Sequence, residues 1–270
     1  MRNIAAVAWL TFKEGLGYRL LYGVIIMAVL VMSSAVLVSG FFMRDIAKII
    51  IDFCLTSMGL GGLIVPFFLA VSMLAGDLER RTIFTILCQP ISRRHYILGK
   101  FFGLALLTAV VVLLLGGTGI FAILAGKMLY GERFFTSLNL VSYVVAMAMN
   151  YLAILLLNSL VVLWCCITTS ALLATLLTLA SYVIGQTIDD IVSFIEAGNR
   201  EMPIADTVKY AVQFGQYVFP NLAAFDLKQL AAYGLAIPTS DIAFLVLYCL
   251  AYSAAALSLA VFVFNRRDLT

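Results

Sequence analysis

The sequence predicts an all-α integral membrane protein with six transmembrane helices, and two observations support this prediction. First, 64% of the 270 residues are hydrophobic and only 11% are charged, whereas soluble domains carry about 25% charged residues. Second, the few charges leave long uncharged segments between them. A helix needs about 20 apolar residues to cross the hydrocarbon core of a bilayer, so such segments are the expected spans.

Five uncharged segments define the six predicted spans. Four of them have 24 or 26 residues and fit one helix each: residues 20–43, 53–76, 101–126 and 242–265. The fifth, 134–188, has 55 residues and as one helix would extend about 80 Å. It must therefore fold back on itself, and the small and hydroxylic residues near Cys165–Ala171 are the expected turn. The whole chain, 1–270, is then a single transmembrane domain with both ends on one side.

The basic residues predict the orientation, because cytoplasmic loops carry an excess of Lys and Arg. With both termini in the cytoplasm, the inner loops hold ten basic residues against four acids, and the outer loops hold seven against ten. We therefore expect a multi-pass protein of the cytoplasmic (inner) membrane, with lipid as one partner. The net charge of +3 does not indicate nucleic acid as another.

The N-terminal segment, residues 1–18, precedes the first span. Trp9, Phe12 and Leu16 lie close together on one face if the segment is helical. This pattern fits an interfacial helix that places Trp9 at headgroup depth. A cytoplasmic extension of the first span is the alternative interpretation, and the pattern does not separate the two.

The longest outer region, residues 189–241, carries seven acids against three basic residues and also contains apolar patches at 191–195 and 208–219. Such patches predict short external helices between the fifth and sixth spans rather than an unstructured loop.

Small and polar residues inside the spans admit two interpretations each. Residues 59–62 contain three glycines, and Pro66 follows them; they serve either close helix packing with a proline kink, which is commoner, or a gating hinge. Asn150 and Asn158 lie eight residues apart, on nearly one face of the fourth span. They either line a substrate path or hydrogen-bond to a neighbouring helix, and the second is commoner.

The stretch Asp77–Lys100 stands out between two apolar runs. It contains five Lys or Arg residues, one His and two acids. Pro90 lacks an amide donor and disfavours helix in the residue before it, so a helix cannot continue through Cys88–Ser92. We expect a short helix, a turn and the entry to the third span at the cytoplasmic face. This stretch is interpreted as the handle by which another protein moves the spans.

The same stretch resembles the signature loop of type-2 ABC transporter permeases. The resemblance rests on Glu79-Arg80-Arg81-Thr82-Ile83, on Pro90-Ile91-Ser92-Arg93 and on Tyr96-Ile97-Leu98-Gly99-Lys100. The ending Phe264-Asn265-Arg266-Arg267-Asp268-Leu269 is also similar to endings in that family. Many members have Gly where Arg81 stands here. In its layout the resemblance covers the whole chain. In its motifs it covers about 30 residues, at 77–100 and 264–269.

The resemblance implies a coupling helix in the loop 77–93 that sits in a groove of a separate cytoplasmic ATPase. Its implied ATPase-coupling residues are Glu79, Arg80, Arg81, Thr82, Ile83, Pro90 and Arg93. Among them, the charged residues would form ion pairs at the rim, and Pro90 would stiffen the turn so that force reaches the third span. For Arg94 and Lys100 we expect instead attraction to anionic headgroups at the lipid-facing start of that span.

The resemblance also implies the partners. Two ATPase copies and a second permease copy, with a homodimer expected, would form the working unit. The sequence has no GxxxxGK[ST] motif, so no ATPase activity is expected of this chain. It is expected to bind no cofactor, and ATP and Mg²⁺ would bind the partner ATPase. The predicted function is a permease subunit that exports a substrate.

Two other classes of function remain as alternatives. A secondary carrier or channel would work without an ATPase, but ion-coupled carriers place charged residues within their spans, and the five uncharged segments contain none. A membrane enzyme or scaffold is disfavoured because the only histidine is His95, within the basic stretch, and no catalytic cluster or metal-ligand spacing accompanies it.

Overall fold

The protein folds as a bundle of long helices. The computed structural model describes residues 2–17, 20–41, 45–74, 92–135, 138–196, 212, 214–216, 218–235 and 237–266. Within these ranges the regular structure is entirely helical, without a strand. Among the described residues, six helices are long and apolar enough to cross a membrane, which confirms the predicted fold class with its six candidate spans.

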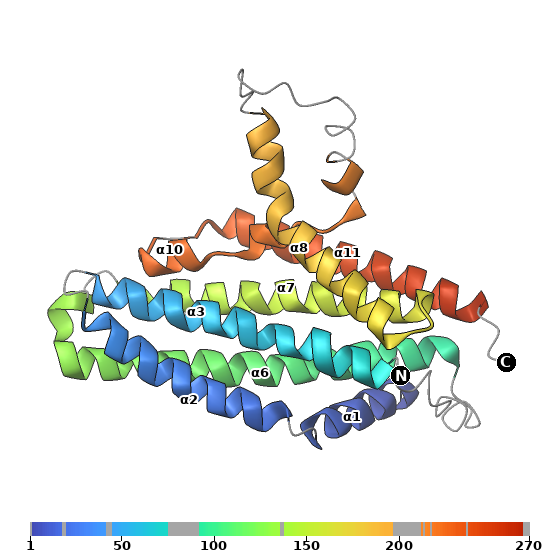
Figure 1. Ribbon diagram of the computed structural model, residues 1–270, viewed down its shortest axis with the longest axis horizontal. Helices are drawn as coiled ribbons and strands as arrows, with labels where there is room; N and C mark the ends of the chain where they lie inside the picture. Colours follow the sequence, from blue (N-terminus) through green and yellow to red (C-terminus); the bar gives the residue numbers. More distant parts are fainter. Residues whose placement is uncertain are drawn as a thin grey trace.

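The spans are α2 (Leu20–Ser39), α3 (Ile46–Ile64) with its continuation η1 (Val65–Ala70), α6 (Arg93–Tyr130), α7 (Leu140–Ile167), α8 (Ala171–Glu196) and α11 (Thr239–Arg266). The remaining elements are α1 (Arg2–Gly17), η2 (Glu132–Phe135), η3 (Ala223–Phe225) and α10 (Lys228–Ala232). Figure 1 shows α2, α3, α6, α7 and α11 running along the same direction, while α8 turns away from the bundle in its second half.

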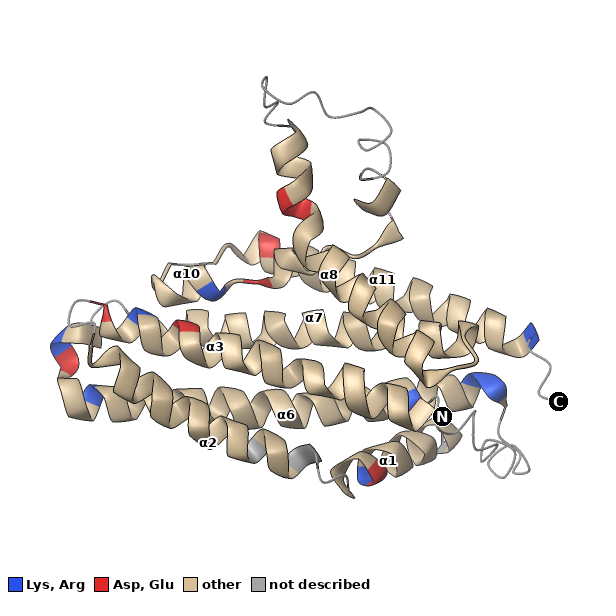
Figure 2. Ribbon diagram, in the orientation of Figure 1, with Lys and Arg blue, Asp and Glu red and all other residues tan. Residues whose placement is uncertain are grey.

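Charged residues lie toward the two ends of the long helices and also on the projecting half of α8, beside α10 and at the start of α11, whereas the middle of α2, α6 and α7 carries none (Figure 2). One end holds the start of α6 and the end of α11, and we call it the Arg93 end. The opposite end holds the start of α3, the end of α6 and the start of α7. This separation of charge is what a membrane-spanning bundle requires.

The long uncharged segment 134–188 folds back where the sequence predicted. Helix α7 ends at Ile167 and α8 begins at Ala171. Thr168 adopts an extended conformation, which ends α7. The turn is therefore only three residues long, as expected when two antiparallel helices pack against each other.

Three helix ends differ from those predicted by charge spacing. Helix α3 begins at Ile46 and therefore includes Lys48 and Asp52, which lie between the predicted spans 20–43 and 53–76. Helix α6 begins at Arg93, and α8 continues to Glu196, so the apolar patch 191–195 belongs to α8 and not to a separate short helix. Charges mark where an apolar segment ends, but a helix satisfies its own backbone and can continue into polar surroundings.

The glycines of α3 serve close packing. A Cβ atom on Gly61 would meet Leu115 and Met27, and one on Gly62 would meet Ile154. Beyond them, Pro66 lies at the start of the π-helical segment η1. Because Pro66 has no amide hydrogen, the carbonyl of Gly62 accepts a hydrogen bond from Val65. The expected proline disturbance is thus present as a local change of helix type.

Candidate functional site

Most of the predicted coupling stretch lies outside the described residues, which resume at Ser92. Six of the seven predicted coupling residues therefore have no structural description: Glu79, Arg80, Arg81, Thr82, Ile83 and Pro90. Arg93 is described, and it begins α6. The site can thus be examined where the stretch enters the bundle.

Ser92 determines where α6 begins. Its backbone is extended, and its side chain accepts a hydrogen bond from the amide of His95. The Ser92 hydroxyl also contacts the His95 ring nitrogen Nδ1. Serine at this position provides a hydrogen-bond acceptor for a backbone amide that has no partner within the first helical turn. The Ser-Arg pair of the sequence motif is therefore a helix cap followed by the first helical residue.

Arg93 connects the start of α6 to the end of the last span. Its Nη1 atom donates hydrogen bonds to the carbonyls of Phe264 at 3.1 Å and Asn265 at 3.2 Å. Its guanidinium also lies 5.9 Å from the centre of the Phe264 ring. The Tyr96 ring stacks on the same Phe264 ring, with 6.2 Å between the two ring centres. A cation at a helix C-terminus is favourable, because the last carbonyls lack partners and the helix dipole is negative there.

Helix α1 packs tightly on the first part of α6. A Cβ atom on Gly99 would lie 2.6 Å from the Cβ of Val7, and one on Gly103 would lie 2.7 Å from the carbonyl oxygen of Ala8. Such distances leave no room for a side chain, so the two glycines allow the backbones to approach. Trp9 remains 62% exposed on another face of α1, and its predicted place among lipid headgroups stays a prediction.

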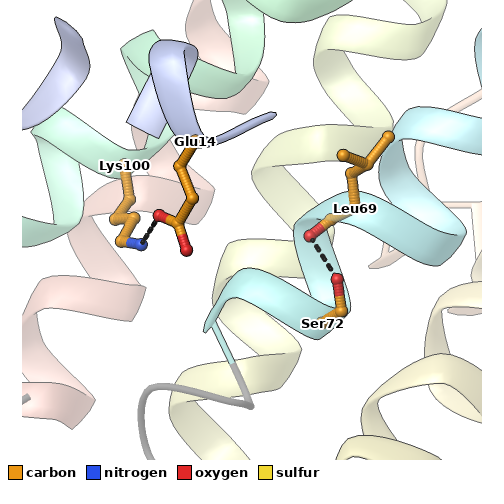
Figure 3. A network of polar contacts seen from close by, with 4 residues as sticks. All are labelled: Glu14, Leu69, Ser72 and Lys100. Carbon is orange, nitrogen blue, oxygen red and sulfur yellow. Dashed lines mark hydrogen bonds and ion pairs between the residues drawn. The ribbon is translucent and has the colours of Figure 1, made fainter. Parts of the chain in front are cut away.

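Lys100 corrects one expectation from the sequence. It was expected to face lipid headgroups, but it is 3% exposed. Its Nζ atom lies 3.8 Å from a carboxylate oxygen of Glu14 on α1 (Figure 3) and 5.8 Å from the centre of the Tyr96 ring. The physical reason is the position of α1, which covers this side of α6, so a lysine there pairs within the protein.

The two asparagines of α7 face different neighbours. Asn158 is fully buried, and its amide nitrogen donates a hydrogen bond of 2.8 Å to the Thr108 hydroxyl of α6. Asn150 instead lines a cavity with α3 and α8. Eight residues correspond to two helical turns plus about 80°, which separates the two side chains. The interpretation as a cross-helix hydrogen bond therefore holds for Asn158, and a path-lining role stays a prediction for Asn150.

This cavity has a volume of about 130 Å³ and lies among α3, α7, α8 and the segment 222–228. Four polar side chains from the spans line it: Thr56, Asn150, Tyr182 and Gln186. Asp226 and Lys228 line it from the covering segment and pair with each other at 2.9 Å. The cavity thus combines apolar walls with polar groups at positions well inside the spans.

The segment that covers the cavity is held to α8 and α11 by hydrogen bonds. The Leu222 amide donates to the carbonyl of Gly185 at 2.8 Å, and Asn221 donates from Nδ2 to Asp189 at 2.6 Å and from its amide to the Tyr248 hydroxyl at 3.1 Å. A Cβ atom on Gly185 would lie 2.6 Å from the carbonyl oxygen of Pro220, so glycine is needed where this segment reaches α8.

Sequence reasoning did not identify these contacts as parts of a site. One signal was present, because Gly99 and Gly103 form a GxxxG pattern, which is typical of closely packed membrane helices. No comparable local signal marks Glu14 or the covering segment 222–228, because their contacts join residues far apart in the chain. Among the described residues, no group of three or more His, Cys, Asp or Glu side chains could hold a metal ion.

Comparison with protein families gives one match. The chain matches the family described as ABC-2 family transporter protein over residues 6–269. The match includes all six spans, the basic stretch and the covering segment. Comparison with curated proteins finds no match.

Proposed function

The chain belongs to the ABC-2 family of transporter proteins, the membrane permease subunits of ABC transporters, and from this premise we propose that it exports a substrate across the cytoplasmic membrane by coupling to a separate ATPase. The observation that supports this proposal most strongly is the family match over 6–269 on a bundle with six apolar spans.

Energy would come from a partner. The sequence contains no GxxxxGK[ST] motif that could cradle a nucleotide phosphate, and the family implies an ABC ATPase as partner. We propose that two such ATPases, which bind ATP and Mg²⁺, assemble with two copies of this chain as a homodimer. Export is the direction that the family resemblance favours, and the basic loops favour a cytoplasmic position for both termini.

The contact with the ATPase would be made by the loop 77–93. Glu79, Arg80 and Arg81 would pair with charges on the ATPase surface, with Thr82 and Ile83 beside them, and such rim pairs weaken in high salt. Pro90 would hold the turn that leads into the Ser92 cap. Displacement of the loop would then act on α6 at its first residue.

The contacts of Arg93 suggest how that displacement spreads. Its hydrogen bonds to Phe264 and Asn265 join the start of α6 to the end of α11, and the tight contact of α1 at Gly99 and Gly103 joins a third helix to the same unit. A push on the loop would thus move α6, α11 and α1 together. This unit would be the mechanical input of the permease.

Association with the ATPase tests the proposal. A tagged chain, extracted from native membranes, should co-purify with an ABC ATPase identified by mass spectrometry. Replacing Glu79 and Arg80 together with alanine should remove the ATPase while the six spans remain inserted. Arg94→Ala is the matched control, because Arg94 is an exposed neighbour on α6 that is not expected to touch the ATPase.

Two results would contradict the proposal. Survival of both ATPase association and transport in the Glu79, Arg80 double variant would show that the loop is not the contact. Movement of solute through liposomes that contain the chain alone would instead favour the alternative of a channel or secondary carrier.

A further inference from the structure

The cavity described above has features of a binding site rather than of a packing defect. Its four polar side chains from the spans, Thr56, Asn150, Tyr182 and Gln186, make no side-chain hydrogen bond to any other residue that the structure describes. All four are partly exposed to the cavity. Genuinely empty cavities in proteins are apolar, so this one is expected to hold a partner for these groups.

The position of these groups strengthens the argument. Thr56 lies within α3, Asn150 within α7 and Gln186 within α8, all on candidate spans. Polar side chains within a span are costly when they have no hydrogen-bond partner. Four such groups that converge from three helices therefore indicate a polar occupant of the cavity.

The charges at the cavity define the class of occupant. Asp226 and Lys228 neutralise each other, and the nearby Asp189 accepts a hydrogen bond from Asn221. The cavity therefore offers no unbalanced charge from its described lining residues. Amides and hydroxyls both donate and accept hydrogen bonds, which suits hydroxyl, amide or carbonyl groups on a molecule without net charge.

The apolar walls and the volume of the cavity indicate the apolar part and the size of the occupant. Leu60, Leu63, Ile154 and Phe225 supply apolar surface beside the polar groups. The volume of about 130 Å³ is smaller than the roughly 300–1,000 Å³ typical of drug-sized pockets. The cavity therefore fits a small molecule, or the polar end of a longer one whose tail follows the apolar wall.

We propose that this cavity binds a small amphipathic molecule without net charge, through Thr56, Asn150, Tyr182 and Gln186. The binding of this molecule does not depend on the proposed transport function. Only its role as cargo rests on that function. The covering segment 222–228 is held beside the cavity by hydrogen bonds to Gly185, Asp189 and Tyr248.

Protection of a cysteine placed in the cavity tests the proposal. The full chain carrying Thr56→Cys is reconstituted in nanodiscs, in a background without the native cysteines, and its labelling rate with a small maleimide is measured. Three probes with the same tail are compared: hexyl β-D-glucoside, hexyltrimethylammonium and hexyl sulfate. If Thr56→Cys fails to fold, Gln186→Cys serves in its place.

We expect hexyl glucoside to slow labelling, by about four-fold at a concentration three times its dissociation constant, and the two charged probes to have little effect. Val141→Cys is the matched control, because Val141 lies on α7 outside the cavity and is 70% exposed. Adding Asn150→Asp to the Thr56→Cys chain introduces a negative charge and should shift protection from the glucoside to hexyltrimethylammonium.

Three outcomes would overturn the inference. Equal protection by all three probes, or protection at Val141→Cys as well, would indicate partitioning into lipid. Absence of protection by any probe would show that water alone occupies the cavity. Since labelling needs no ATPase, failure of the unmodified chain to co-purify with an ABC ATPase would contradict the proposed function and leave this binding result intact.

Discussion

The Arg93 end and the cavity differ in how tightly their helices pack and in how their polar side chains are paired. At the Arg93 end, glycines bring α1 and α6 into backbone contact, Lys100 is buried beside Glu14, and Arg93 caps α11. Around the cavity, polar side chains of three helices lack protein partners among the described residues. The difference indicates that one region is suited to transmit movement as a unit and the other to accommodate a ligand.

The two regions also differ in how they are connected. The Arg93 end joins α1, α6 and α11, which come from the beginning, middle and end of the chain, so contacts between distant parts of the sequence hold it together. The cavity is bordered by the segment 222–228, which is attached through hydrogen bonds at Asn221 and Leu222 and through the buried side chain of Phe225. Packed interfaces tend to move as units, whereas helices that frame a cavity have fewer contacts to break when they shift.

The largest effect is expected from filling the contact between α1 and α6. Gly103→Leu would drive a side chain into the Ala8 carbonyl and Thr11, and overpacking of this kind costs about 1–3 kcal/mol. We expect ATP-driven transport by the reconstituted complex to fall about ten-fold or more.

Gly117→Leu provides the control on the same helix, because a Cβ atom at Gly117 meets nothing within 4 Å. If Gly103→Leu and Gly117→Leu transport equally well, the Arg93 end is not a tightly packed unit.

Loss of the Arg93 cap should have the next largest effect. Arg93→Met keeps the length of the side chain but removes the hydrogen bonds to Phe264 and Asn265. Hydrogen bonds that involve a charged group are worth about 1.5–3 kcal/mol, so we expect about a ten-fold loss of transport. The ATPase should remain bound, and its ATP hydrolysis should continue without transport.

Arg93→Lys should recover only part of the transport, since lysine lacks the planar fork of donors. Arg94→Met is the matched control at the exposed neighbour. Release of the ATPase by Arg93→Met would show that Arg93 acts on the partner and not through α11.

A smaller effect is expected for the pair of Lys100 and Glu14. Glu14→Gln leaves a buried ammonium beside a neutral amide, whereas Lys100→Met leaves Glu14 partly exposed to solvent. Glu14→Gln should therefore lower the melting temperature of the purified complex more than Lys100→Met does. We expect Glu14→Gln to lower it by about 2–4 °C, for a loss of about 1 kcal/mol in stability.

A double-mutant cycle measures the interaction itself, because it removes the separate effects of each substitution. Additive effects of Glu14→Gln and Lys100→Met would show that the two side chains do not interact.

The smallest effect concerns Asn158 and Thr108, which lie between the two regions. Hydrogen bonds between membrane helices contribute about 0.6 kcal/mol on average, so the coupling energy of Asn158→Leu with Thr108→Val should be near this value. Denaturation of the purified chain in mixed micelles would measure it. A coupling energy near zero would indicate that the 2.8 Å contact contributes nothing to stability.

The sequence was sufficient to predict the fold class because hydrophobicity is a strong local signal. Uncharged segments of spanning length gave six helices, and the 55-residue segment had to turn near Cys165–Ala171. Helix ends were predicted less well, as at Ile46 and Glu196, since helices continue past the first charge. The buried position of Lys100 could not be predicted, because it depends on where α1 packs.

The site was predicted only in part for the same reason. Motif resemblance selected Arg93, but its contacts with Phe264 and Asn265 join residues more than 170 positions apart. Asn150 and Asn158 were paired by spacing, although 80° of helical rotation directs them to different neighbours. The cavity itself forms where α3, α7, α8 and the segment 222–228 pack together. No local sequence pattern predicts which of these elements lie side by side.

The central claim is that the Arg93 end moves as one unit while the cavity changes shape. Distances between spin labels test it most directly, measured by pulsed electron paramagnetic resonance on the complex with its ATPase, with and without trapped ATP. One pair, Lys13→Cys on α1 and Phe102→Cys on α6, reports the Arg93 end. The other pair, Phe53→Cys on α3 and Leu179→Cys on α8, spans the helices that frame the cavity.

All four positions are exposed in the structure, so the labels should not disturb packing. We predict that trapped ATP leaves the distance between positions 13 and 102 unchanged and shifts the distance between positions 53 and 179. A shift between positions 13 and 102 with no change between positions 53 and 179 would contradict the account.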